Sequence, residues 1–83
     1  MNISIELYAS LMKYLPPGQS RFRRDLKVDD GLFLNRLIEQ FHITPEEAHL
    51  VLVNGLFVVG EERDSRNLSE GDVVSIWPPV AGG

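Results

Sequence analysis

The chain begins with an alternation of apolar and polar residues, which is typical of a strand with one buried face. The apolar positions are Ile3, Ile5 and Leu7. Residues 9–15 can then form a short helical turn, which Pro16-Pro17-Gly18 must end because proline disfavours helix in the residue before it. We therefore expect a first strand followed by a brief helical turn.

A second alternation follows these prolines. Its apolar positions are Phe22, Leu26 and Val28. They predict a strand that runs back antiparallel to the first. Arg24 shares their parity and would point inward, so either this strand lies at the edge of the sheet or it contains a bulge.

One helix is predicted by four apolar residues spaced at i, i+3, i+4 and i+7. They are Leu34, Leu37, Ile38 and Phe41. Asp29 or Asp30 can cap this helix, because a short side-chain oxygen accepts hydrogen bonds from the otherwise unpaired N–H groups of a first turn.

Two further signals follow the predicted helix, a capping motif and a hairpin. Thr44-Pro45-Glu46-Glu47 has the spacing of a capping box and predicts a second, short helical turn. Residues 50–53 are apolar on both faces, which favours an inner strand. The Asn54-Gly55 pair tolerates the positive φ angles of a tight hairpin, whose second strand would be residues 56–59.

The last strand is predicted over residues 73–77, after a polar loop and a turn at residues 68–72. Pro78 and Pro79 end it, because neither can donate a backbone hydrogen bond to a neighbouring strand. The order β-β-α-β-β with a last strand favours an α+β fold, a β-grasp (ubiquitin-like) roll. We expect a mixed sheet of four to five strands with one main helix on one face. The domain would span residues 1–77, and a flexible C-terminal tail residues 78–83.

Composition limits the possible functions. The chain has 83 residues, enough for one small core but not for a deep catalytic cleft. It has no cysteine, which excludes disulfides and thiol nucleophiles. Its net charge of −4 opposes binding to nucleic acid or anionic membranes, and no stretch approaches the roughly 18 apolar residues of a membrane span. Because residues 1–6 lack a signal-peptide pattern, we expect a cytoplasmic protein.

Other candidate chemistry is weak. His42 and His49 lie seven residues apart with no cysteine nearby, so we expect no metal site. The basic cluster at residues 21–24 has one interleaved aromatic residue, which indicates solvated strand residues rather than a nucleic-acid site. The adjacent carboxylates at 29–30 and 46–47 lie where helix N-termini favour negative charge. No serine lies in a nucleophile-elbow pattern.

The end of the chain is its least ordinary feature. It reads Trp77-Pro78-Pro79-Val80-Ala81-Gly82-Gly83. The two prolines hold the backbone extended and direct it out of the sheet. Glycines lack a Cβ, so they can pass a narrow channel and leave a terminal carboxylate unshielded, as an acyl-activating partner requires. The alternative is a frayed end without a function.

Three segments resemble a known family. They are Leu68-x-Glu70-Gly71-Asp72-Val73-Val74-x-Ile76 with the ending at 78–83, Val53-Asn54-Gly55, and Leu7-Tyr8-Ala9-Ser10-Leu11. They are similar to the closing motif, the central hairpin and the end of the first strand of the MoaD/ThiS family of sulfur-carrier proteins. The Pro-Pro-Val-Ala-Gly-Gly ending resembles the molybdopterin branch of that family more than the thiazole-forming branch.

This resemblance implies a function that depends on partner enzymes. A ubiquitin-activating-type adenylyltransferase would use ATP to adenylate the C-terminal carboxylate, and a sulfur donor would convert it to a thiocarboxylate. A sulfur-acceptor enzyme, such as the large subunit of molybdopterin synthase, would receive the sulfur in molybdenum cofactor biosynthesis. The carrier would bind no cofactor and would not itself be an enzyme.

The reacting group implied by the resemblance is the carboxylate of Gly83. The residues expected to contact partners are Gly82, Ala81, Val80, Pro79, Pro78, Trp77 and Phe57. Three alternatives stay open: a carrier for thiamine thiazole or another sulfur-transfer pathway, a β-grasp interaction module that never carries an acyl group, and a modifier conjugated to lysines through the same terminus.

Overall fold

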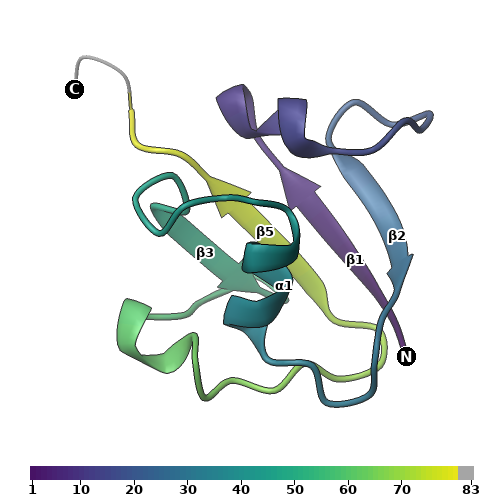
Figure 1. Ribbon diagram of the computed structural model, residues 1–83, viewed down its shortest axis with the longest axis vertical. Helices are drawn as coiled ribbons and strands as arrows, with labels where there is room; N and C mark the ends of the chain where they lie inside the picture. The colour runs from purple at the N-terminus through teal and green to yellow at the C-terminus, as the bar shows by residue number, and fades with distance from the viewer. Residues whose placement is uncertain (81–83) are drawn as a thin grey trace.

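The fold is a mixed sheet of five strands, seen in a computed structural model that describes residues 1–80 (Figure 1). The strands are β1 (Asn2–Leu7), β2 (Arg23–Lys27), β3 (Leu50–Val53), β4 (Leu56–Phe57) and β5 (Val73–Trp77). Their order is β2-β1-β5-β3-β4, with β1 and β5 parallel and the other neighbours antiparallel. The predicted α+β, β-grasp arrangement is confirmed.

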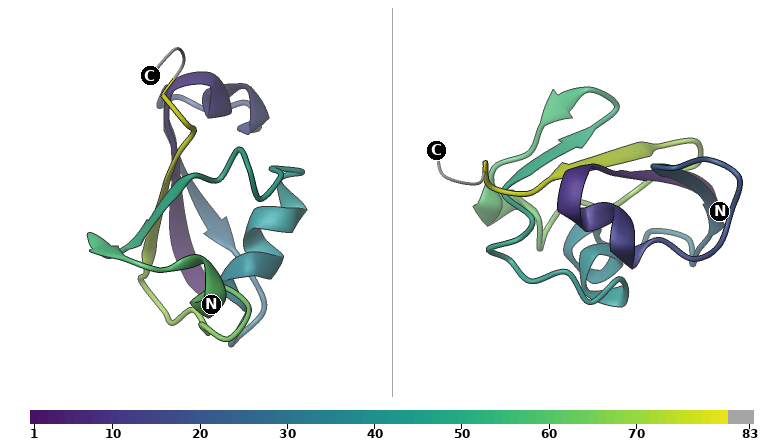
Figure 2. Two further views of the ribbon diagram at one scale, coloured as in Figure 1. Left: turned by 90° about the vertical axis from the view of Figure 1, so that its left-hand side faces the viewer. Right: turned by 90° about the horizontal axis from the view of Figure 1, so that it is seen from above.

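The helical elements are α1 (Leu34–Gln40) and the 3₁₀ helices η1 (Ala9–Tyr14) and η2 (Gly60–Glu62). Figure 2 shows α1 and η1 on the same side of the sheet. Six of the side chains that the alternation and the helical spacing place in this core are at most 2 % exposed, whereas Leu26, Val28 and Phe41 are only partly buried. The six buried residues are Ile3, Ile5, Leu7, Leu34, Leu37 and Ile38. The predicted inward position of Phe22 is wrong, because its side chain is 39 % exposed and stacks on the ring of Tyr8. The opposite face of the sheet carries no helix within residues 1–80.

The helix begins later than predicted, and the predicted cap at Asp29 or Asp30 is wrong. The N-cap residue is Phe33, which makes no side-chain capping hydrogen bond. The first two N–H groups of α1 instead donate to backbone carbonyls of the loop at 63–66, at 2.8 and 3.0 Å. Because that loop satisfies the donors, no side-chain cap is needed. The Asp30 carboxylate accepts a hydrogen bond from the Met1 ammonium group at 3.0 Å.

The predicted capping box forms, although residues 45–47 make only a turn. The Glu47 N–H donates to Thr44 Oγ1 at 3.1 Å, and the Thr44 N–H donates to the Glu47 carboxylate at 3.1 Å. Tyr14 of η1 also donates its hydroxyl proton to this carboxylate, at 2.7 Å. The bonds from Thr44 and Tyr14 lower the pKa of Glu47, and the acceptor raises the pKa of Tyr14. The box therefore also connects this turn to η1.

Arg24 points inward because β2 is an edge strand, one of the two predicted explanations. Its pairing with Ile5 continues an uninterrupted antiparallel register, so the strand contains no bulge. The guanidinium group donates to the carbonyls of Pro16 at 2.8 Å and of Ser20, so the inward-pointing charge is satisfied by the loop after η1.

The predicted hairpin is confirmed, with a shorter second strand, Leu56–Phe57, than the expected 56–59. Asn54 and Gly55 have φ angles of +53° and +81°. The Asn54 side chain also joins the hairpin to the start of β5. It donates to Asp72 Oδ1 at 2.9 Å and accepts a hydrogen bond from the Val73 N–H at 2.9 Å.

Replacing Asn54 with alanine is expected to lower the free energy of unfolding by about 2 to 3 kcal/mol. Alanine disfavours the positive φ angle and removes both hydrogen bonds, one of them to the buried Asp72. Urea unfolding followed by Trp77 fluorescence measures the effect. Asn54→Gly is the matched control, because it keeps the turn conformation and loses only the hydrogen bonds. Equal losses in both variants would contradict a contribution from the backbone conformation.

Candidate functional site

The tail leaves the sheet at the end of a central strand. Trp77 closes β5, opposite Leu50 of β3, and its carbonyl accepts a hydrogen bond from the His49 N–H at 3.1 Å. Pro78 is half-buried, whereas Pro79 and Val80 are exposed, and Figure 1 shows the chain turning away beyond β5. Ala81, Gly82 and Gly83, with the expected reacting carboxylate, lie outside the described residues.

Three aromatic rings stack beside this exit. The ring of Tyr8 lies 4.3 Å from that of Trp77, with an angle of 6° between their planes. On its other side it lies 5.4 Å from the ring of Phe22. The Tyr8 N–H also donates to the Ile76 carbonyl at 3.1 Å, which extends the pairing of β1 with β5. Trp77, the last residue of β5 before the tail, is therefore held by both its backbone and its ring.

The open face of the sheet carries a partly exposed apolar strip that includes this stack. We define the apolar strip as Leu50, Leu52, Phe57, Trp77, Tyr8 and Phe22. The register places Leu52 opposite Phe57 and Leu50 opposite Trp77. Phe57 is 58 % exposed, although an aromatic side chain of this size is normally covered. The two aromatic residues selected from the sequence, Trp77 and Phe57, thus share one face.

Sequence reasoning missed other members of the strip. Leu50 and Leu52 alternate with the buried Val51 and Val53, so their parity places them on the open face once β3 is known to pair with β5. Tyr8 has the parity of the polar residues in β1, and that signal was present in the sequence.

A polar network lies next to the apolar strip, centred on Glu6. This carboxylate accepts hydrogen bonds from Ser75 Oγ at 2.8 Å, the Tyr8 hydroxyl at 2.9 Å and the Arg23 guanidinium at 3.1 Å. Arg23 also donates to Ser4 Oγ at 3.0 Å. Burial raises the pKa of Glu6, but the hydrogen bonds from Ser75 and Tyr8 and the charge of Arg23 outweigh it, so the pKa is lowered. Glu6 is therefore ionised and internally paired at neutral pH.

Comparison with known proteins identifies the family. The model of the ThiS family matches residues 5–83. The chain belongs to the ThiS family. The predicted MoaD/ThiS resemblance is thereby confirmed.

One curated relative of this ThiS-family chain is the small archaeal modifier protein 3 of Haloferax volcanii. The two are 46 % identical over 54 residues, which is 65 % of this chain and 55 % of the relative. The matched segment thus spans about half the length of that protein.

Solved structures share the fold of this ThiS-family chain. Over the full length of both chains, thiamine biosynthesis protein ThiS from Geobacter metallireducens gives a TM-score of 0.66 at 18 % identity. SAMP1 from Haloferax volcanii gives 0.66 at 20 % identity, also over all of both chains. The complex of subunits 1 and 2 of the molybdopterin-converting factor from Helicobacter pylori contains a chain that gives 0.59 at 19 % identity over the whole of each. At these identities the likeness shows the fold.

The pKa of Glu6 predicts how this ThiS-family domain responds to acid. A carboxylate with a lowered folded-state pKa contributes stability above its ordinary value of 4.5, and that contribution is lost as pH falls through the folded-state pKa. We expect Glu6→Gln to be less stable than wild type at pH 7 and the difference to shrink steadily below about pH 4.5. Melting temperatures between pH 3 and 7 measure it. Ser75→Ala should reduce the pH dependence of the melting temperature in part. Parallel curves of melting temperature against pH for Glu6→Gln and wild type would contradict a lowered pKa of Glu6.

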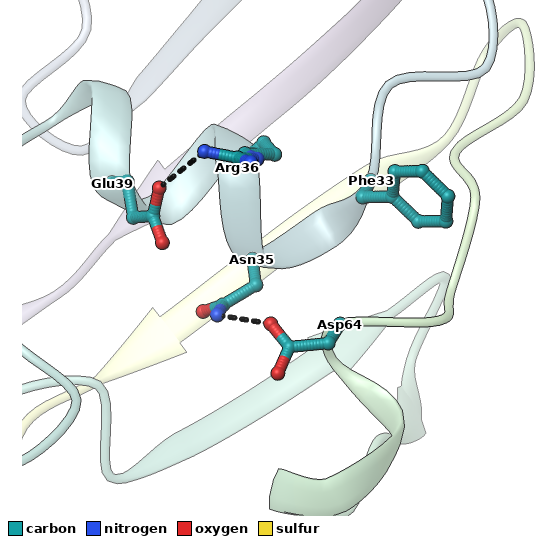
Figure 3. Close-up of a pocket in the computed structure, with 5 residues that line it drawn as sticks. All are labelled: Phe33, Asn35, Arg36, Glu39 and Asp64. Atoms are coloured by element: carbon teal, nitrogen blue, oxygen red, sulfur yellow. Dashed lines mark hydrogen bonds and ion pairs between the residues drawn. The ribbon is translucent and has the colours of Figure 1, made fainter.

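One hollow of this ThiS-family domain away from the tail is lined by polar groups that are already paired. A shallow pocket of about 360 Å³ beside α1 is lined by Phe33, Asn35, Arg36, Glu39 and Asp64 (Figure 3). Its polar groups pair with one another, since the Asn35 side-chain amide donates to Asp64 and Arg36 lies 3.4 Å from Glu39. Within residues 1–80, no three His, Cys, Asp or Glu side chains lie close enough together to hold a metal ion. Within the same residues, no helix has the length and apolarity needed to cross a membrane.

Proposed function

We propose that this ThiS-family chain is a sulfur carrier whose Gly83 carboxylate is adenylated and then converted to a thiocarboxylate. The observation that supports this proposal is the exit of the tail at Trp77, directly beside the exposed apolar strip. A partner bound to the strip would have the tail within reach, because six extended residues span roughly 20 Å. Docking and chemistry would thus use two adjacent parts of one surface.

The proposed chemistry needs little from the carrier itself. A carboxylate oxygen of Gly83 attacks the α-phosphorus of ATP and pyrophosphate leaves, which gives an acyl adenylate. A hydrosulfide ion supplied by a donor then attacks the carbonyl carbon, AMP leaves, and loss of the S–H proton gives a thiocarboxylate. The partner supplies the groups that stabilise both transition states, so the carrier needs no cofactor of its own and ATP is bound by the partner.

The proposed activating partner is an adenylyltransferase of the ubiquitin-activating type, and the proposed acceptor is the large subunit of a molybdopterin synthase in the cytoplasm. The Pro-Pro-Val-Ala-Gly-Gly ending, similar to the molybdopterin branch, supports this acceptor over the thiazole pathway. The Helicobacter pylori complex gives an example of a protein with this fold assembled with a second subunit.

A second candidate function is that of a protein modifier. It is favoured by the 46 % identity to small archaeal modifier protein 3, whose name states such a role. The first step would be the same, since adenylation also prepares the carboxylate for attack by a lysine amine. The two functions therefore diverge only in the nucleophile that follows.

Intact mass spectrometry tests both functions. The full chain is incubated with ATP, a cognate activating enzyme and a sulfur donor. Exchange of one oxygen for one sulfur supports the carrier, whereas isopeptide adducts on lysines of other proteins favour the modifier. An unchanged mass, under conditions in which a known carrier reacts, would contradict both functions. It would favour the remaining alternative, a β-grasp interaction module that never carries an acyl group.

A further inference from the structure

Ala9 has an unusual backbone conformation directly beside the tail. Three residues other than glycine have positive φ angles within residues 1–80: Ala9 at +52°, His42 at +60° and Asn54 at +53°. Asparagine tolerates this left-handed region and forms the hairpin turn here. Alanine does not favour it, because its Cβ approaches the following carbonyl oxygen. Ala9 is therefore strained in a way that glycine would avoid.

The fold explains why the chain turns at this residue. The Tyr8 N–H still pairs with the Ile76 carbonyl of β5 at 3.1 Å, and the Leu11 N–H already donates to the Tyr8 carbonyl at 3.0 Å to close the first turn of η1. Leu11 is fully buried, so the turn cannot be delayed. One residue must therefore reverse the chain. Glycine would do so without strain, and the turn alone does not explain a side chain at this position.

Ala9 also lines a groove beside the tail. Ala9 and Ser10 form one wall of a mainly apolar groove of about 450 Å³, and the other wall consists of Trp77, Pro78, Pro79 and Val80. The only side-chain atom of alanine is its Cβ, so the methyl group that causes the strain belongs to a residue of the groove beside the tail. Pro78 and Pro79 have no N–H, so packing rather than their own backbone donors must hold this segment.

We propose that Ala9 is a positioning residue: its methyl group restricts where Pro78 and Pro79 can lie and so fixes the direction in which the tail leaves the domain. Removal of the methyl group widens the groove and gives the proline segment more freedom. A less ordered segment loses more conformational entropy when it enters a partner's channel. The effect on turnover rests on the proposed function, whereas the effect on the proline segment does not.

The first test compares Ala9→Gly with a matched control variant, His42→Gly. Both substitutions relieve a positive φ angle, but the exposed His42 lies after α1 and does not line the groove. Thermal unfolding should show Ala9→Gly at least as stable as His42→Gly relative to wild type. NMR relaxation of Pro79 Cα and Val80 N–H should show order parameters lower by about 0.1 or more in Ala9→Gly and unchanged in His42→Gly. Unchanged order in Ala9→Gly would overturn the proposal, whatever the function of the tail.

The second test measures adenylation by ATP–pyrophosphate exchange with the activating enzyme. Ala9→Gly should lower kcat about threefold to tenfold, with unchanged affinity for the enzyme in the absence of ATP, and His42→Gly should match wild type. Lower order at Val80 with an unchanged rate would overturn the role of Ala9 in turnover. A wild-type chain that is not adenylated would instead refute the proposed function, and the relaxation measurements would still decide whether Ala9 positions the tail.

Discussion

Removal of Gly82 and Gly83 is expected to abolish adenylation, with a loss of at least about 1,000-fold in ATP–pyrophosphate exchange. The carboxylate of Ala81 would then be the terminal group, and it would lie roughly 7 Å short of the reacting position. A displacement of about 1 Å can already cost on the order of 100-fold in rate. Affinity for the activating enzyme should change less than about threefold, because the apolar strip is intact.

A second variant and a stability measurement complete this experiment. Gly83→Ala keeps the length of the tail and adds one Cβ, so it should fold normally and be adenylated poorly. Both variants should unfold at the wild-type temperature. Full adenylation of the shortened chain would contradict the carrier function, and loss of folding would show that the tail packs into the domain. An interaction module would keep its partner affinity and show no exchange with or without the glycines.

The fold was predictable where one buried face dictates the spacing of apolar residues. Ile3, Ile5 and Leu7 alternate because one side of β1 is buried, and the register of β1 with β5 then follows from burial. The cap of α1 was not predictable. Its first two N–H groups are satisfied by the loop at 63–66, and no local pattern predicts a carbonyl that lies about thirty residues away in the chain.

Only part of the candidate site could be predicted from the sequence. The tail and Trp77 stand out because prolines and glycines interrupt the pattern of a strand. Leu50 and Leu52 do not, since β3 is apolar on both faces and its composition is the same whether the second face is covered by protein or open. The Glu6 network also needs the sheet, because Ser75 and Arg23 reach that carboxylate from the two strands that flank β1.

Phe57→Asp is expected to weaken binding to the activating enzyme by about 10- to 100-fold. Phe57 is 58 % exposed in the edge strand β4, opposite Leu52, so a carboxylate is tolerated in the free domain. In a complex that covers the apolar strip, the same carboxylate would be desolvated without a partner. Isothermal titration calorimetry measures the affinity, and thermal unfolding verifies that stability is retained.

Phe33→Asp is the matched control for Phe57→Asp. Phe33 is 41 % exposed and precedes α1, on the side of the sheet away from the apolar strip, so its substitution should change the affinity less than about twofold. Phe57→Asp should also raise KM for adenylation and leave kcat near wild type, because its tail is intact. Removal of the two glycines should instead lower kcat for adenylation and leave KM near wild type. Equal effects of the two phenylalanine substitutions would show that the strip is not the docking surface, even if the terminal carboxylate reacts as proposed.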